Sequence, residues 1–122
     1  MRILIVDDIF TNRLLLSEVL NNLELEYDDV ENGKEAIEAI QKNDYDLVLM
    51  DIEMPVMNGL ETTKYIREQL PHPKNTISIV ALTAHNPQLF FEDFKDVGFD
   101  QLLIKPYSIE KISSLVEEVR GG

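Results

Sequence analysis

The sequence predicts an α/β fold in which five parallel strands alternate with five helices, and the helices cover both faces of one doubly wound sheet. Two patterns support this fold class. Short apolar runs, such as residues 47–50, are too short for helices and are typical of strands buried on both faces. The segments between these runs repeat apolar residues at spacings of three and four, as amphipathic helices do. Strict alternation of the two favours a parallel sheet, because strand–helix–strand crossovers are right-handed.

Each predicted strand is a short apolar segment that ends at polar or turn-forming residues. β-branched residues are enriched in the first run, and they favour an extended backbone. The second run is more polar than the first and suits an edge position in the sheet. The predicted strands are residues 2–6, 25–30, 47–50, 77–82 and 102–104.

The first two helices are predicted from an apolar stripe and from a capping signal. The first helix begins near Thr11. Its inward stripe comprises Leu15, Leu16, Val19, Leu20 and Leu23. The second helix begins after Asn32, whose side chain can cap it, and Glu35 three residues later resembles the second half of a capping box. Its buried face comprises Ala36, Ile37 and Ile40.

The third helix repeats the same start signal, with Asn58 in the cap position and Glu61 three residues later. It ends before Pro71, because proline cannot continue a helix. Its predicted inward residues are Leu60, Thr63 and Ile66.

The last two helices have equally clear boundaries. Asn86 followed by Pro87 opens the fourth helix, and Gly98 is placed to end it with a positive φ. The apolar residues of the fourth helix are Leu89, Phe90, Phe91, Phe94 and Val97. Ser108 caps the fifth helix. The inward residues of the fifth helix are Ile109, Ile112, Leu115, Val116 and Val119.

Length and composition fit one intracellular domain. The 122 residues can hold a core without disulfides, and we expect a domain over residues 1–120 with residues 121–122 as a terminal linker. The absence of cysteine and of any long apolar run predicts a soluble, cytoplasmic domain that does not span a membrane. The 11 basic and 23 acidic side chains give a net charge of −12, which disfavours binding to nucleic acid or anionic membranes and favours divalent cations or basic partner surfaces.

Polar residues follow four of the five predicted strands. Asp7 and Asp8 follow the first strand, and Asp51 follows the third. Thr83 follows the fourth strand, and Lys105 follows the fifth. Parallel strands place all five residues at one edge of the sheet, where open α/β sheets bind their ligands.

This set of residues suits phosphoryl transfer. Three carboxylates at about 5 Å repel by roughly 3 kcal/mol for each pair, and Mg²⁺ would offset that cost. Lys105 adds a positive charge, and Thr83 and the backbone amides from Ala84 onward can donate hydrogen bonds to an oxyanion. Asp51 would then be the nucleophile that forms an acyl phosphate.

The same residues resemble those of the receiver domains of two-component response regulators. The motifs Asp7-Asp8, residues 50–59 around Asp51, Leu82-Thr83-Ala84 and Lys105-Pro106 occur in the family's order and spacing. The resemblance covers residue 3 to the last helix. It implies a flavodoxin-like doubly wound sheet with the strand order 2-1-3-4-5, which is the strand order of receiver domains.

The resemblance also implies roles for the site residues. Asp51 would accept a phosphoryl group from a histidine kinase or a histidine phosphotransfer domain. Asp8 and Asp51 would bind Mg²⁺ together with the backbone carbonyl of Glu53, while Asp7 would act mainly through a water. Thr83 and Lys105 would contact the phosphoryl oxygens, and the Lys105–Pro106 peptide would be cis.

The implied function is a signalling switch and not an enzyme that turns over a separate substrate. Phosphorylation would alter the surface from the fourth strand to the fifth helix, which a downstream effector or a second copy of the domain could bind through the fourth and fifth helices. Leu102 occupies a position that is often aromatic in the family, so an aromatic switch is not expected. Glu53 and His85 occupy positions that tune the lifetime of the acyl phosphate.

Two other functions stay open from the sequence. A pseudo-receiver would dock a partner without being phosphorylated and would bind Mg²⁺ weakly. A small hydrolase of the haloacid dehalogenase type also uses an aspartyl phosphate and needs an acid two residues later, where Glu53 stands. That family, however, has aspartate at both places and puts its nucleophile after the first strand, whereas Asp51 follows the third.

Overall fold

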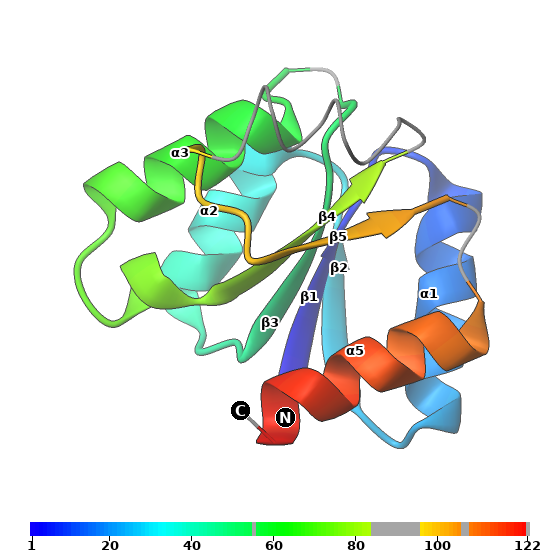
Figure 1. Cartoon of the computed structure of the whole chain (residues 1–122). Coiled ribbons are helices and arrows are strands. Elements are labelled where there is room, and N and C mark those ends of the chain that lie inside the picture. Colours follow the sequence, from blue (N-terminus) through cyan, green and yellow to red (C-terminus); the bar gives the residue numbers. More distant parts are fainter. Residues whose placement is uncertain (55, 84–95, 106–107, 122) are drawn as a thin grey trace.

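A computed structural model describes residues 1–54, 56–83, 96–105 and 108–121 of the chain (Figure 1). Its centre is one five-stranded parallel sheet with the order β2-β1-β3-β4-β5. The predicted α/β class, the parallel pairing and the strand order are all confirmed, and the polar second strand lies at an edge as expected. The strands are β1 (Arg2–Val6), β2 (Glu26–Val30), β3 (Leu47–Asp51), β4 (Ser78–Thr83) and β5 (Gln101–Ile104).

Helices cover both faces of the sheet. α1 (Phe10–Asn22) and α5 (Ile109–Gly121) lie on one face, and α2 (Gly33–Lys42) and α3 (Gly59–Gln69) lie on the other (Figure 1). A short 3-10 turn, η1 (Lys74–Thr76), leads into β4. The predicted helix after Asn86 and Pro87, with Leu89, Phe90, Phe91 and Phe94, lies outside the described residues. Within the described ranges, none of the helices is long and apolar enough to cross a membrane.

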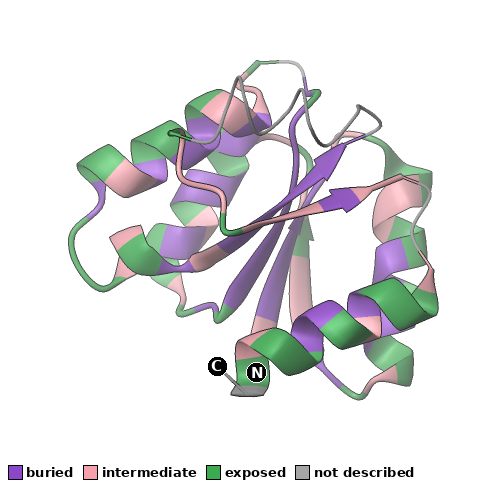
Figure 2. Ribbon diagram, in the orientation of Figure 1, coloured by how far each residue is buried: buried purple, intermediate pink, exposed green. Residues whose placement is uncertain are grey.

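The core is divided by the sheet into two apolar layers. In β3, Leu47 and Leu49 pack with α1 and α5, whereas Val48 and Met50 pack with α2 and α3. All four side chains are fully buried, and Figure 2 shows the same burial along the central strands. A strand buried on both faces has no need of polar residues until it ends, which explains the continuous apolar run. Asp51 is the residue at which β3 ends.

Three of the predicted helix caps form. Asn58 Oδ1 accepts from the Glu61 amide at 2.8 Å, and the Asn58 amide donates to Glu61 Oε1 at 3.3 Å, which completes a capping box. Asn32 Oδ1 accepts from the Glu35 amide at 2.9 Å. Ser108 Oγ accepts from the Lys111 amide at 3.1 Å. The caps therefore fix where α2, α3 and α5 begin, as the sequence indicated.

Most of the predicted core is confirmed. Gly98 has the positive φ of +116° expected for it, and Leu23, Val97 and Val119 are partly buried. The predicted inward residues that are buried are Leu16, Val19, Leu20, Ala36, Ile37, Ile40, Thr63, Ile66, Ile112, Leu115 and Val116.

Two predicted inward residues are instead exposed. Leu15 is exposed because adjacent helical residues point about 100° apart, and Leu16 takes the inward direction in α1. Ile109 is exposed because it is the first residue of α5, one turn before Ile112, which enters the core. Both predictions were wrong. For Leu15, apolar spacing alone does not say which of two adjacent leucines faces inward, and for Ile109 it does not say where the helix first meets the core.

The buried face of α3 also differs from the prediction. Leu60 is only half-buried, and Thr62 is buried in addition to Thr63. α3 turns Thr62 toward α2, where a β-carbon on Gly33 would lie 1.8 Å from Thr62 Oγ1. The Thr62 hydroxyl donates to the Asn58 carbonyl at 2.7 Å, so its burial leaves no unpaired donor.

Candidate active site

The carboxyl ends of four neighbouring strands bring the predicted site residues to one edge of the sheet. Asp7 directly follows β1, and Asp51 is the last residue of β3. Thr83 is the last residue of β4, and Lys105 directly follows β5. β1 pairs with β3, β3 with β4, and β4 with β5, all in parallel, so these residues lie side by side across the sheet.

Asp51 is the buried centre of this edge, with 1% of its surface exposed. Its Oδ1 accepts from the Glu53 amide at 3.2 Å and from Lys105 Nζ at 3.3 Å. The Lys105 side chain extends from the end of β5 past β4 to reach β3. Among the described residues, Asp51 is therefore held by a donor from its own loop and by Lys105, which directly follows the edge strand β5.

The pKa of Asp51 is raised to about 6 from the 3.8 of an ordinary aspartate. Burial is the main cause, because it disfavours the charged carboxylate, and the negative charge of Asp7 adds to the shift. The Glu53 amide and the Lys105 ammonium act in the opposite direction. Asp51 thus stays largely ionised at neutral pH, which a carboxylate nucleophile requires.

Three carboxylates gather beside each other at the site. Asp7, Asp8 and Asp51 each place one oxygen within 4.8 Å of the others. Asp7 Oδ1 accepts from the Ile9 amide at 2.9 Å, but Asp7 Oδ2 and Asp8 Oδ1 are buried without a hydrogen-bond partner among the described residues. Buried oxygens without donors are costly, and hard oxygen ligands are those that Mg²⁺ prefers. The donor set therefore fits a divalent cation.

Arg13 holds the backbone of Asp7, a contact that the sequence analysis missed. One guanidinium nitrogen donates to the Asp7 carbonyl at 2.8 Å, and Nε pairs with Asp29 Oδ2 at 3.1 Å. The only signal in the sequence is that Arg13 is the single basic residue of the first helix. That signal does not say which carbonyl the side chain would reach.

The loop after Asp51 returns very close to the end of β3. A β-carbon on Gly59 would lie 2.4 Å from the Asp51 carbonyl oxygen and 2.7 Å from the Ile52 α-carbon. Only glycine allows α3 to begin against these backbone atoms, and the Gly59 amide donates to the Ile52 carbonyl at 3.2 Å. Between them, Val56 has φ +70°, an uncommon conformation for a β-branched residue.

The remaining predicted site residues are placed only in part. Thr83 is 1% exposed, and its carbonyl accepts from the Lys105 amide at 2.8 Å. The Glu53 side chain is exposed. Ala84, His85 and Pro106 lie outside the described residues, and with Pro106 the predicted cis peptide after Lys105. A cis peptide does occur between His72 and Pro73, in the segment between α3 and η1.

Exposed apolar side chains accompany the acidic residues, another feature that the sequence analysis missed. Phe10 is 65% exposed and Ile9 is also exposed on the segment after β1. Val56 is 82% exposed on the segment after β3. Segments that carry the site thus also present apolar surface, which is a common property of protein-binding sites.

Together, the parallel sheet and the acidic edge define a flavodoxin-like α/β domain whose three neighbouring carboxylates fit a divalent cation. Residues 3–117 match the family model described as the response regulator receiver domain. The chain belongs to this family of receiver domains of two-component systems.

Named relatives and one solved structure agree with this assignment. The two-component response regulator 24 of Arabidopsis thaliana is 35% identical over 95% of this chain and 81% of its own length. The sensor protein GacS of Pseudomonas syringae pv. syringae is 37% identical over 98% of this chain but only 13% of its own length. The receiver domain of a sensor histidine kinase from Pseudomonas aeruginosa, solved with magnesium in its active site cleft, is 28% identical with a TM-score of 0.89, over 99% of this chain and 98% of that one.

These matches place similar domains in two settings. The chain spans most of the response regulator but only a small part of the sensor kinase. The comparisons therefore show the receiver fold and the family, which is a family of signalling domains.

Proposed function

We propose that this chain is the phosphoacceptor domain of a two-component phosphorelay and that Asp51 is its acceptor. The observation that carries the proposal is the contact between the buried Asp51 and Lys105, at 3.3 Å, beside Asp7 and Asp8. One positive and three negative side chains meet at the end of β3, around the buried Asp51 carboxylate. This arrangement supports phosphoryl transfer better than simple structural pairing, because an ion pair that served stability alone would be weakened by the nearby negative charges of the buried Asp7 and the half-buried Asp8.

In the proposed step, an Asp51 carboxylate oxygen attacks the phosphorus of a phosphohistidine on the partner. The new bond joins oxygen to phosphorus, the phosphorus–nitrogen bond breaks, and the imidazole nitrogen leaves with the electron pair and takes a proton. Lys105 neutralises charge on the transferring group and Thr83 donates to one of its oxygens. Mg²⁺, when bound, would neutralise further charge there, held by Asp8, Asp51 and the Glu53 carbonyl, with Asp7 acting through water.

The response would follow from the added charge. A phosphoryl group adds about 1.5 to 2 negative charges, and Thr83 and Lys105 move toward it. Because both residues end strands of the β4–β5 edge, the shift alters the surface from β4 to α5, which a downstream effector or a second copy of the domain would read. Leu102 lies in β5 at the position that is often aromatic in the family, so the response would not use an aromatic switch.

The proposed partner is a histidine kinase or a histidine phosphotransfer domain in the cytoplasm. The exposed Ile9, Phe10 and Val56 give such a partner apolar surface next to the acceptor. The net charge of −12 favours a basic docking surface and disfavours nucleic acid or an anionic membrane. The domain would be a switch that catalyses its own phosphorylation and slow dephosphorylation, and not an enzyme for another substrate.

The test is the intact mass after incubation with acetyl phosphate and Mg²⁺. We expect the parent chain to gain one phosphoryl group and expect no gain with Asp51→Asn or with a chelator. Fast hydrolysis could hide the product, so beryllofluoride is added in a second experiment as a stable phosphoryl mimic. No mass gain together with no spectral change in beryllofluoride would contradict the proposal and favour a protein-binding module.

A further inference from the structure

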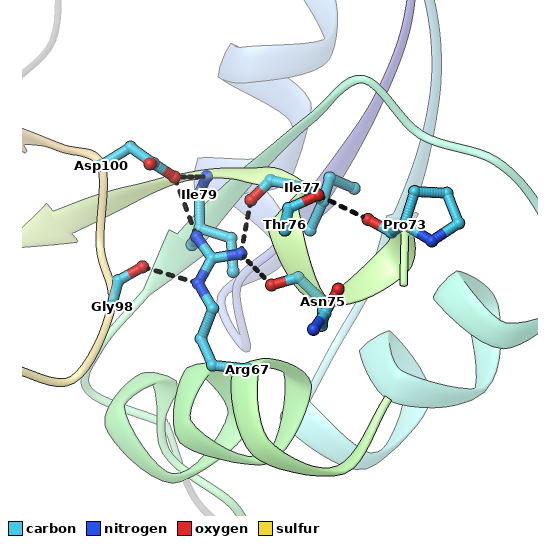
Figure 3. Close-up of polar contacts among 8 residues, drawn as sticks. All are labelled: Arg67, Pro73, Asn75, Thr76, Ile77, Ile79, Gly98 and Asp100. Atoms are coloured by element: carbon cyan, nitrogen blue, oxygen red, sulfur yellow. Dashed lines mark hydrogen bonds and ion pairs between the residues drawn. The ribbon is translucent and has the colours of Figure 1, made fainter. Parts of the chain in front are cut away.

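Arg67, near the end of α3, joins three segments at the opposite end of the sheet from Asp51. Its Nε donates to the Gly98 carbonyl at 2.9 Å (Figure 3). One terminal nitrogen donates to the carbonyls of Asn75 at 2.9 Å and Ile77 at 2.7 Å. The other pairs with Asp100 Oδ2 at 2.9 Å. The guanidinium thus spans the segments that lead into β4 and β5.

Asp100 is joined to β4 as well as to Arg67. The Asp100 amide donates to the Ile79 carbonyl at 2.9 Å. The Ile79 amide donates to Asp100 Oδ2 at 2.7 Å (Figure 3). The carboxylate therefore receives a charged and a neutral donor on one oxygen. Because Asp100 directly precedes β5, these bonds fix which residue of β4 faces the first residue of β5.

Gly98 brings the incoming chain close enough for this arrangement. It has φ +116°, and a β-carbon there would lie 2.8 Å from Arg67 Cγ. A side chain at this position would displace either the segment or Arg67. The segment before β5 is therefore built to lie against the arginine side chain.

The register of β5 matters for Lys105. β5 has four residues and lies at the sheet edge with one neighbouring strand, so few ladder bonds hold it. A slip of one residue would move Lys105 by about 3.3 Å and turn its side chain to the other face of the sheet. In the observed register Thr83 pairs with Ile104, and Lys105 reaches Asp51.

We propose that Arg67 and Asp100 are positioning residues for the active site, because they set the register of β5 and so place Lys105 at Asp51. Neither side chain belongs to the acidic edge of the sheet. Both act from the amino ends of β4 and β5. The catalytic consequence rests on the proposed function, whereas the effect on register does not.

Three variants and one control test the roles of the Asp100 carboxylate and the Arg67 guanidinium. Asp100→Ala removes both bonds to the carboxylate, and Asp100→Asn keeps an oxygen that can accept from the Ile79 amide. Arg67→Met removes the guanidinium and with it the bonds to Gly98, Asn75, Ile77 and Asp100. The control is Arg2→Met, which removes the pair between Arg2 and Asp28 at the β2 edge of the same sheet. A general loss of stability would appear in the control as well.

The first readout is amide hydrogen exchange measured without any phosphoryl donor. The Lys105 amide donates to the Thr83 carbonyl and should be protected in the parent. We expect exchange at Lys105 to rise about tenfold or more in Asp100→Ala and Arg67→Met, less in Asp100→Asn, and not in Arg2→Met. Unchanged exchange at Lys105 in both Asp100→Ala and Arg67→Met would overturn the inference, whatever the chain does with phosphate.

The second readout is a double-mutant cycle on the rate of phosphorylation by acetyl phosphate. We expect Asp100→Ala to slow the parent about tenfold and to have little further effect in a Lys105→Met background, because the same contact is already lost. Equal slowing in both backgrounds would show a merely structural role. If the parent takes up no phosphoryl group, the proposed function fails while the exchange experiment still decides the register.

Discussion

Lys105 Nζ lies 3.3 Å from Asp51 Oδ1, although 54 positions of the sequence separate the two residues. The contact exists because β4 alone separates β3 from β5 in the sheet. It supplies the positive charge that offsets part of the repulsion from Asp7, yet the pKa of Asp51 still rises to about 6. The effect of burial thus outweighs that of the lysine, and the charged Asp51 carboxylate is a cost to the stability of the folded chain.

This cost predicts that Asp51→Asn stabilises the metal-free chain at neutral pH. Because its pKa is raised, Asp51 still holds its proton in the folded state between about pH 4 and pH 6. In the unfolded state it has already released that proton over the same range. Stability of the parent therefore falls as the pH rises through that window and then levels off. We expect the variant to gain at most about 3 kcal/mol above pH 6, and little near pH 4.

Urea denaturation in the presence of a chelator across this pH range measures the difference. Asp96→Asn, at an exposed carboxylate, is the matched control and should change stability little at any pH. A gain for Asp51→Asn that does not depend on pH would mean that burial of the charge is not its source.

The sequence predicts the sheet and the edge residues well because these depend on local patterns. β3 is apolar until Asp51, and the box of Asn58 and Glu61 marks the start of α3, so strand ends and helix starts follow directly. The choice between Leu15 and Leu16 could not be predicted, since it depends on how α1 is rotated over the sheet.

Polar contacts between residues far apart in the sequence could not be predicted either. Arg67 and Asp100 are 33 positions apart, and nothing in the spacing of either residue marks the other as its partner. Arg13 likewise bonds a backbone carbonyl, which carries no residue type for a pattern to recognise. The residues at this sheet edge could be predicted because strand ends follow from local patterns, whereas the residues that hold them in place depend on tertiary geometry.

Thr83→Ala should separate phosphorylation from the response to it. The variant keeps Asp51, Lys105 and the acidic residues, so uptake from acetyl phosphate should stay within about threefold of the parent rate. The conformational response should weaken, because the hydroxyl that would bond the phosphoryl oxygen is gone. Amide chemical shifts of β4, β5 and α5 with beryllofluoride measure this response, and an unaltered response in the variant would count against the role of Thr83.

Mg²⁺ should stabilise the folded chain through the acidic cluster. Binding to the folded state alone adds about 2.7 kcal/mol when the ion is at 100 times its Kd. We expect thermal unfolding of the parent to shift upward with Mg²⁺ and the shift to shrink in Asp8→Asn, which removes one of the three carboxylates. Asp44→Asn, at a fully exposed carboxylate, should keep the full shift. Equal shifts in the two variants would place the ion elsewhere.

Gly59→Ala should disturb Asp51, the proposed acceptor, without changing any charged group. The added β-carbon would lie 2.4 Å from the Asp51 carbonyl oxygen and 2.7 Å from the Ile52 α-carbon, and neither backbone atom can rotate away as a side chain would. Overpacking of this kind costs about 1 to 3 kcal/mol, which should exceed the gain from the better helix propensity of alanine. The end of β3 would have to shift, and with it the distance from Asp51 to Lys105.

Two measurements test this prediction together. Urea denaturation should show the loss of stability, and the rate of phosphorylation by acetyl phosphate should fall because the acceptor is displaced from its lysine. Lys64→Ala, at an exposed position of the same helix, is the control and should leave both quantities near the parent values. If Gly59→Ala were as stable and as reactive as the parent, the close approach of α3 to Asp51 would not be what sets the acceptor geometry.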